Sequence, residues 1–153
     1  MHIETARLRL IPCTQEQLPV ITRQNYQNGP EITNHLKALE QDPSLLFWGS
    51  WLIIRQADDV IIGDAGFKGK PDRDGEVEIG YGLLEHYWQN GYATEAVAGL
   101  IQWARQTTAV SNIAAKTDAT NRGSIRVLEK VNMERLQETD STIYWEIQTN
   151  PIN

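Results

Sequence analysis

The fold is decided by residues 77–104, which read VEIGYGLLEHYWQNGYATEAVAGLIQWA. The first part of this stretch alternates apolar with polar or small residues from Val77 to Leu83, which predicts a strand with one face in the core. The second part repeats apolar residues at the i, i+3, i+4, i+7 spacing of a helix that packs one face against a core. That apolar stripe consists of Ala93, Ala96, Val97, Leu100, Ile101 and Ala104.

The sequence before this unit predicts one strand, two helices and a β-hairpin. Segments rich in aromatic and β-branched side chains flank the polar tetrapeptide 56–59, as expected for two strands joined by a turn. These two strands should pair antiparallel. The expected elements are a strand at 7–11, a helix capped by Thr14, a helix at 32–41, and strands at 48–55 and 60–67.

The sequence after the core helix predicts a strand, another helix and two final strands. Asn121 can cap this helix, and Asn132 tolerates the left-handed conformation that ends one. The order β-α-α-β-β-β-α-β-α-β-β predicts one α+β (mixed α/β) domain over residues 1–153, in which a crossover helix joins only the fourth and fifth strands. The expected strands lie at 113–117, 133–138 and 143–147.

The composition is that of an ordinary folded domain and disfavours several classes of function. Of the 153 residues, 41% are hydrophobic and 22% are charged, which argues against disorder and coiled coils. Twenty acidic residues outnumber fourteen basic ones, giving a net charge of -6. Because the basic residues are scattered, no nucleic-acid partner is expected, and the acidic balance favours a cationic substrate such as an amine.

The cysteine count and the hydropathy pattern predict a cytoplasmic protein. Cys13 has no second cysteine with which to form a disulfide or a zinc site, so we expect a structural thiol in a reducing compartment. The sequence shows no basic start followed by an apolar stretch and no run of about 18 apolar residues, so neither export nor a membrane partner is expected. No spacing of His, Asp or Glu resembles a metal site, so no metal is expected.

The connection from the strand to the core helix, residues 85–96, has the features of an anion site. Gly91 lacks a Cβ that could block a phosphate, and the first N–H groups of a helix have no intrahelical partner. An ordinary strand-to-helix turn explains the same features equally well. Neither the GxxxxGK[ST] pattern of a P-loop nor the GxGxxG pattern of a dinucleotide fold occurs here, which disfavours ATP and NAD.

Three segments carry motifs that point to one family. They are residues 78–81 with 87–96, EIGY and YWQNGYATEA, residues 121–133, NRGSIRVLEKVNM, and residues 4–10, ETARLRL. The first resembles the acyl-CoA signature of the GNAT N-acetyltransferases, and the second resembles the NxxSxxVLEKxGF segment of the same superfamily. The third is similar to the start of the branch that includes the ribosomal-protein N-terminal acetyltransferases, the RimJ/RimL-like branch. The resemblance covers almost the whole chain.

Three positions depart from the family pattern. Trp88 stands where the Q/RxxGxG/A signature has Gln or Arg, and this substitution looks like the RimJ/RimL-like branch. Asn132 stands where the second motif usually has Gly, which αL-tolerant Asn can replace, and Met133 replaces an aromatic residue. None of the three touches the expected chemistry.

The resemblance implies a fold and a cosubstrate. The implied fold is a central mixed, mostly antiparallel sheet of about seven strands flanked by about four helices, with the fourth and fifth strands splayed for acetyl-CoA. The pyrophosphate is expected on backbone N–H groups, where a helix dipole favours an anion without a lysine. The resemblance implies that Asn121 contacts the pantetheine region of the cofactor; capping its own helix is an equally good role, and the two can coexist. The implied cofactor-binding residues are Tyr81, Gly82, Leu83, Gln89, Asn90, Gly91, Tyr92, Ala93, Thr94, Asn121 and Ser124.

Acetyl transfer to an amine needs a base, an oxyanion site and a proton for the departing thiolate. Glu78 is the expected base, directly or through water, because it shares a strand face with Gly80 and Gly82, which leave room for a substrate. A solvent-facing carboxylate or an ion pair with a neighbouring strand is the alternative. Backbone N–H groups near residues 81–83 are expected to hold the oxyanion. The resemblance makes Ser124 the expected acid, since it matches the position whose hydroxyl can face the CoA sulfur; helping to cap its helix is the alternative.

Other side chains have weaker ties to this chemistry. His86 precedes the loop and could reach the acceptor or a phosphate, but a surface or structural role is the more common one for histidine. Tyr144 and Glu146 could assist either catalytic role, although packing on the last strand explains them better. The resemblance places the acceptor surface on the early helices and the strands after them, while core packing is the alternative for aromatic residues there. These aromatic residues are Tyr26, Trp48 and Trp51.

The residues and the resemblance together lead to one function and one alternative. The leading interpretation is an acetyl-CoA-dependent N-acetyltransferase that acts on a primary amine, at a protein N-terminus or on a small molecule. Direct attack in a ternary complex is expected, since no activated nucleophile for an acyl-enzyme is visible. The alternative is a catalytically inactive acyl-CoA-binding module that serves as a sensor or scaffold. A monomer or homodimer is expected in either case.

Overall fold

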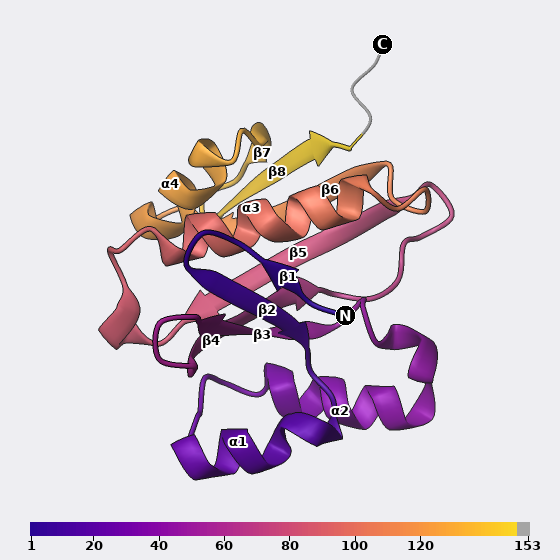
Figure 1. The fold of residues 1–153 in the computed structure, drawn as a ribbon. Helices are drawn as coiled ribbons and strands as arrows, with labels where there is room; N and C mark the ends of the chain where they lie inside the picture. The colour runs from indigo at the N-terminus through magenta and orange to yellow at the C-terminus, as the bar shows by residue number, and fades with distance from the viewer. Residues whose placement is uncertain (150–153) are drawn as a thin grey trace.

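The computed structural model describes residues 1–149, which form an eight-stranded sheet with helices on both faces (Figure 1). The strands lie in the order β1-β2-β3-β4-β5-β6-β8-β7, and only β5 and β6 are parallel neighbours. The predicted α+β fold with a mixed, mostly antiparallel sheet is confirmed. The strands are β1 (Ile3–Glu4), β2 (Leu8–Pro12), β3 (Ser50–Arg55), β4 (Val60–Phe67), β5 (Glu76–Leu83), β6 (Asn112–Asp118), β7 (Glu134–Glu138) and β8 (Thr142–Gln148).

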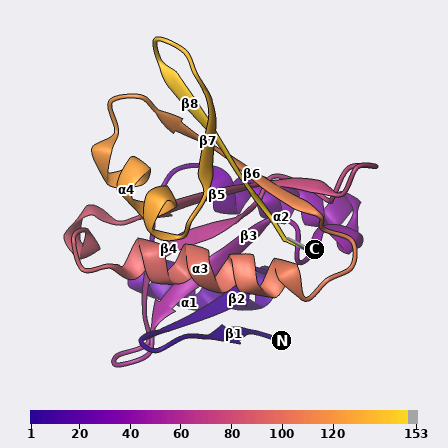
Figure 2. The same cartoon turned by 90° about the horizontal axis from the view of Figure 1, so that it is seen from above.

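The helices divide between the two faces of the sheet, and each face has its own core. Figures 1 and 2 show α3 and α4 on one face, and α1 and α2 on the other. The predicted stripe of α3 is buried from Ala96 to Ala104, as expected for a core-facing helix, while Ala93 is half-buried. The helices are α1 (Leu18–Gln24), α2 (Glu31–Gln41), α3 (Tyr92–Arg105) and α4 (Arg122–Lys130).

An aromatic cluster joins the hairpin β3–β4 to α3. Trp103 of α3 stacks against Trp48 and Trp51, with ring centroids 5.1 and 5.3 Å apart, and also contacts Phe67 of β4. Trp51 is fully buried and its indole N–H donates to Phe47 O at 3.1 Å. Core packing, and not an acceptor pocket, is therefore the confirmed interpretation of Trp48 and Trp51.

The structure corrects the predicted elements at a few ends. The two-residue strand β1 was not predicted, because alternation cannot be recognised over two residues. Trp48 precedes β3 because its N–H donates to Leu45 O in a turn. Thr14 caps a short 3₁₀ turn that continues into α1, and Asn132 adopts the predicted left-handed conformation with φ 68°.

The two edges of the sheet are formed by its most irregular strands. At one edge, β1 is only two residues long. At the other edge, all five residues of β7 are exposed, and the register slips between Arg135 and Gln137. Leu136 at this slip is 57% exposed.

Candidate active site

The ladder of the sheet opens into a gap where β5 and β6 part. The two strands pair only as far as Glu78, although both continue. Lys68 N–H donates to Glu78 O, so Glu78 turns its backbone groups toward β4. Since successive residues of a strand direct these groups to opposite edges, Tyr81 and Leu83 turn their N–H groups toward the gap. The predicted splay is confirmed, and a role of these two N–H groups in holding an oxyanion stays a prediction.

The start of α3 presents free backbone donors. Gly91 precedes the helix with φ 81° and provides no side-chain cap. The first helical bond runs from Glu95 N–H to Gly91 O at 3.1 Å, so the three N–H groups before it have no intrahelical partner. Gln89 also has a positive φ, 66°, which the sequence did not predict. The free donors belong to Tyr92, Ala93 and Thr94, and an anion fits them without a lysine.

The loop before α3 is held in shape by its own side chains. Asn90 Nδ2 donates to the carbonyl oxygens of Tyr87 and Trp88, at 3.2 and 3.0 Å. Trp88, which departs from the family pattern, donates its indole N–H to Leu83 O at 2.9 Å and ties the loop to the end of β5. The side chain of Asn90 is thereby occupied within the loop, which leaves the backbone as the surface for a ligand.

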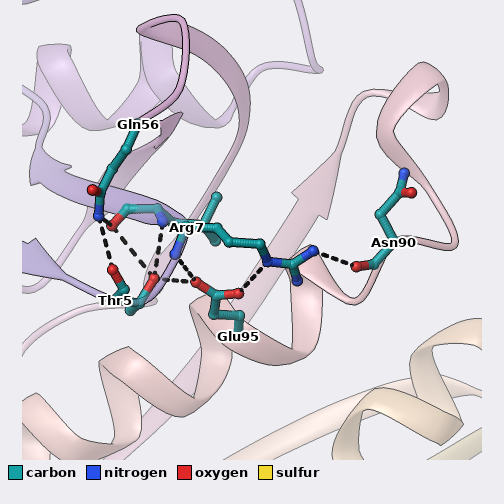
Figure 3. A network of polar contacts seen from close by, with 6 residues as sticks. Thr5, Arg7, Gln56, Asn90 and Glu95 are labelled. Atoms are coloured by element: carbon teal, nitrogen blue, oxygen red, sulfur yellow. Dashed lines mark hydrogen bonds and ion pairs between the residues drawn. The ribbon is translucent and has the colours of Figure 1, made fainter.

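Arg7 fastens this loop and the first turn of α3 to β2 (Figure 3). The carboxylate of Glu95 accepts bonds from Thr5 Oγ1, from Arg7 N–H at 2.7 Å and from Arg7 Nε at 2.8 Å. Arg7 Nη1 continues to Asn90 O at 2.9 Å, and the guanidinium lies 4.3 Å from the ring centre of Tyr92. Burial alone would raise the pKa of Glu95, but the bonds from Thr5 and Arg7 hold that pKa below its ordinary value.

The sequence analysis missed this network, although its residues were in the recognised segments. Arg7 belongs to the opening ETARLRL and Glu95 to the motif YWQNGYATEA. Gln56 adds to it by donating to Thr5 O and Leu8 O, at 2.8 and 2.7 Å. The sequence did contain a signal for this network, because one motif has a basic residue and the other an acidic residue.

The start of α4 lies on the other side of this gap from β5. Asn121 Oδ1 accepts from Ser124 N–H at 3.1 Å, so the predicted cap is confirmed. Tyr81 reaches across from β5 and donates its hydroxyl to Ser124 O at 3.2 Å. Burial raises the pKa of Tyr81, which keeps the hydroxyl protonated. The structure thus brings Tyr81, Asn121 and Ser124 together. For Tyr81, the sequence predicted a role only for the backbone N–H group and not for the side chain.

On the face of β5 opposite to the side chain of Tyr81, Glu78 lies between two lysines. Its carboxylate contacts Lys68 Nζ at 3.0 Å and Lys116 Nζ at 3.8 Å. The ion pair with neighbouring strands, which the sequence left as the alternative, is therefore present. A role for Glu78 as base stays a prediction.

The same face carries a buried carboxylate that the sequence analysis did not consider. Asp64 of β4 is the register partner of Gly82 and is only 5% exposed. Its Oδ2 accepts from the hydroxyl of Tyr26 at 2.5 Å. Gly80 and Gly82 keep this face open, because a Cβ on either would meet only Lys68 Cε at 3.3 Å or Asn28 Nδ2 at 3.5 Å.

The remaining candidates lie outside this constellation. Burial raises the pKa of Cys13 to about 12, consistent with a structural thiol, and buried His35 bonds to Cys13 O at 2.9 Å. Tyr144 lies near Lys116, and Glu146 accepts from Asn112, so both take part in packing of the last strands. Within residues 1–149 no group of His, Cys, Asp and Glu is arranged to hold a metal ion.

A hollow of about 530 Å³ lies between β1 and α3. Its lining contains Glu95 but none of the residues predicted to bind the cofactor. The helices of residues 1–149 include none with both the length and the apolar character needed to cross a membrane.

Comparison with known sequences finds one family. The family model described as acetyltransferase (GNAT) domain matches residues 7–134. The N-acetyltransferase YjdG of Bacillus subtilis (strain 168), itself uncharacterized, is 30% identical over 146 residues, which cover 84% of this chain and 87% of YjdG.

Comparison with solved structures finds the same fold. A RimL ribosomal L7/L12 α-N-protein acetyltransferase in complex with coenzyme A superposes with a TM-score of 0.79 at 12% identity, covering 97% of this chain and 98% of RimL. The ribosomal-protein-S5-alanine acetyltransferase of Vibrio fischeri gives 0.79 at 13% identity, covering 99% and 98%. At these identities the likeness concerns the fold.

Proposed function

Because the chain belongs to the GNAT acetyltransferase family, we propose that it transfers an acetyl group from acetyl-CoA to the nitrogen of a primary amine. The observation that carries the proposal is that the parting of β5 from β6 and the start of the helix after β5 both leave backbone N–H groups without a partner in the sheet or the helix. Those of Tyr92, Ala93 and Thr94 at α3 suit a pyrophosphate, and those of Tyr81 and Leu83 suit the oxygen of a thioester carbonyl.

The chain's own residues supply each need of the reaction. The amine nitrogen attacks the acetyl carbon, the carbon–sulfur bond breaks, and the amide and free CoA result. The N–H groups of Tyr81 and Leu83 stabilise the negative charge that develops on the carbonyl oxygen. The departing thiolate takes a proton from Ser124 Oγ, directly or through water, and Ser124 recovers a proton from the nitrogen that becomes the amide. Because a thiol has a pKa of about 8.5, this last step contributes modestly.

We propose a protein N-terminus or a small-molecule amine as the acceptor. The RimL structure is that of an α-N-protein acetyltransferase, and its likeness in fold supports the first class without selecting it. Membership of the RimJ/RimL-like branch, a cytoplasmic location, and a monomeric or homodimeric state stay predictions from the sequence.

Ligand-dependent thermal unfolding tests the cofactor assignment. Acetyl-CoA at a hundred times its Kd is expected to stabilise the protein by about 2.7 kcal/mol, and CoA should act similarly. ATP and inorganic phosphate should leave the unfolding midpoint unchanged. If none of the four ligands shifts the midpoint, the acetyl-CoA site is refuted.

A free-thiol assay with a panel of amines then tests catalysis. Release of CoA thiol that depends on an added peptide N-terminus or alkyl amine supports the transferase. Binding of acetyl-CoA without transfer to any amine of the panel favours the inactive sensor or scaffold module.

A further inference from the structure

A hollow lies between α1 and α2, on the sheet face that carries Asp64. Its volume is about 400 Å³, and apolar side chains of both helices line it together with Tyr26 and Asn28. None of its lining residues is a lysine or an arginine. The apolar lining residues are Leu18, Ile21, Ile32 and Leu36.

One amide nitrogen links this hollow to β5. Asn28 Nδ2 lies 3.2 Å from the hydroxyl of Tyr26 and 2.9 Å from Gly82 O. Gly82 stands between Tyr81 and Leu83, whose N–H groups face the gap between β5 and β6. The carbonyl of Gly82 and the N–H of Leu83 belong to one peptide group, so the polar end of this hollow lies on the β4 side of the peptide whose N–H faces the gap.

A carboxylate lies behind this polar end. Asp64 Oδ2 accepts from Tyr26 at 2.5 Å and from Asn28 at 3.4 Å, and among residues 1–149 no donor reaches Oδ1. Burial raises the pKa of Asp64 to about 6, and the nearby charge of Glu31 adds to the rise, while the bonds from Tyr26 and Asn28 oppose it. Cys13 is the other titratable group nearby, and burial keeps its thiol neutral. Asp64 is thus ionised at neutral pH but is a stronger base than an ordinary aspartate.

We propose that Asp64, acting through the hydroxyl of Tyr26, receives the proton that the acceptor ammonium must lose before it attacks. The inference rests on the proposed function and adds the acceptor side to it. The ammonium N–H bond breaks as its proton passes to Tyr26 O, and the tyrosine proton passes to Asp64 Oδ2. The products are a neutral amine and a neutral carboxylic acid, and Tyr26 returns to its starting form. The two negative charges of Asp64 and Glu31 attract the cation, and the apolar walls strengthen that attraction.

Glu78 is less suited to this task. Its carboxylate is paired with Lys68 and lies near Lys116. These cations occupy the carboxylate and repel an approaching ammonium. Asp64 meets neither obstacle, since its partners within residues 1–149 are the neutral side chains of Tyr26 and Asn28.

The pH dependence of kcat/KM tests the proposal, with free-N-terminus tripeptides and alkyl amines as acceptors. Asp64→Asn is expected to lower kcat/KM about a hundredfold near neutral pH, the ordinary range for a lost general base. The defect should shrink as the pH approaches the pKa of the acceptor, because the amine then arrives deprotonated. Tyr26→Phe should show the same trend. Asp74→Asn, the same chemical change at an exposed turn residue, should follow the wild type at every pH.

Three results would overturn the proposal, each for a different reason. An equal loss for Asp64→Asn at every pH, with the acetyl-CoA-induced thermal shift intact, makes Asp64 merely structural. A pH-dependent loss in Glu78→Gln but not in Asp64→Asn returns the base to Glu78. Wild-type protein that binds acetyl-CoA and acetylates no amine refutes the transferase itself, and the proton acceptor with it.

Discussion

The two sides of the candidate active site are built from different materials. The side proposed to face acetyl-CoA consists mainly of backbone N–H groups at the start of α3 and along β5. The proposed acceptor side consists of side chains from the loop after α1 and from β4, namely Tyr26, Asn28 and Asp64. A backbone site survives most side-chain substitutions and depends on chain conformation, whereas a side-chain site depends on single functional groups.

The largest effect is expected at Asp64, because burial of its carboxylate lowers the stability of the folded protein. Asp64 has a raised pKa in the folded protein, so between about pH 4 and 6 the folded state binds more protons than the unfolded one, and stability falls as the pH rises. Asp64→Asn should remove this penalty, on the order of 2–3 kcal/mol, and raise the midpoint at pH 7–8 by roughly 5–10 °C while activity falls. Thermal unfolding at several pH values measures it. An unchanged difference between wild type and variant from pH 4 to 8 would contradict the buried, charged carboxylate.

The proposed acetyl-CoA side should be sensitive to substitutions that change its backbone conformation. Gly91 has φ 81°, and a Cβ there would lie 3.3 Å from Arg7 Nη2, so Gly91→Val forces the loop to refold. We expect the Kd for acetyl-CoA to rise about 10- to 30-fold, measured by calorimetry. Gly69→Val is the matched control, because Gly69 has φ 113° in open space outside this loop. Equal losses of affinity in both variants would show that strain alone, and not the loop, is responsible.

Arg7 tests whether the backbone donors depend on the side chain that ties their loop to the neighbouring strand. Arg7→Ala removes the guanidinium bonds to Asn90 O and Glu95 and keeps the bond from the backbone N–H to Glu95. The KM for acetyl-CoA is expected to rise about 5- to 10-fold, with kcat and the acceptor KM nearly unchanged. Arg9→Ala serves as control, since Arg9 lies two residues further along the chain, on β2, and its guanidinium pairs with exposed Asp59 at 3.3 Å. A loss confined to kcat would argue that Arg7 acts elsewhere.

The smallest effect is expected at Glu78. Its partners Lys68 and Lys116 are more than half exposed, and such surface ion pairs contribute about 0–1 kcal/mol. Glu78→Gln should change the free energy of unfolding by less than about 1 kcal/mol and kcat/KM by only a few-fold. Denaturant titration and the free-thiol assay measure both. A loss as large as that of Asp64→Asn would remove the contrast between the two carboxylates.

The contrast also explains what the sequence could predict. The stripe of α3 and the left-handed Asn132 follow from residues close together in the chain, and each is found. Tyr26 and Asp64 are 38 positions apart, and Arg7 and Glu95 are 88 apart, so no local pattern couples them. Their meeting depends on strand register and helix packing. A resemblance could place the cofactor loop because that loop is one continuous segment, whereas the acceptor side is assembled from several.

The edges of the sheet affect how the chain behaves among its own copies. An open edge strand can pair with a strand of another molecule and start aggregation, unless it is short, bent or charged. The two residues of β1 offer little to pair with. The slipped, fully exposed β7 carries Glu134, Arg135 and Glu138, so an approaching strand meets charge and a broken ladder. The sheet thereby resists edge-to-edge polymerisation at both ends.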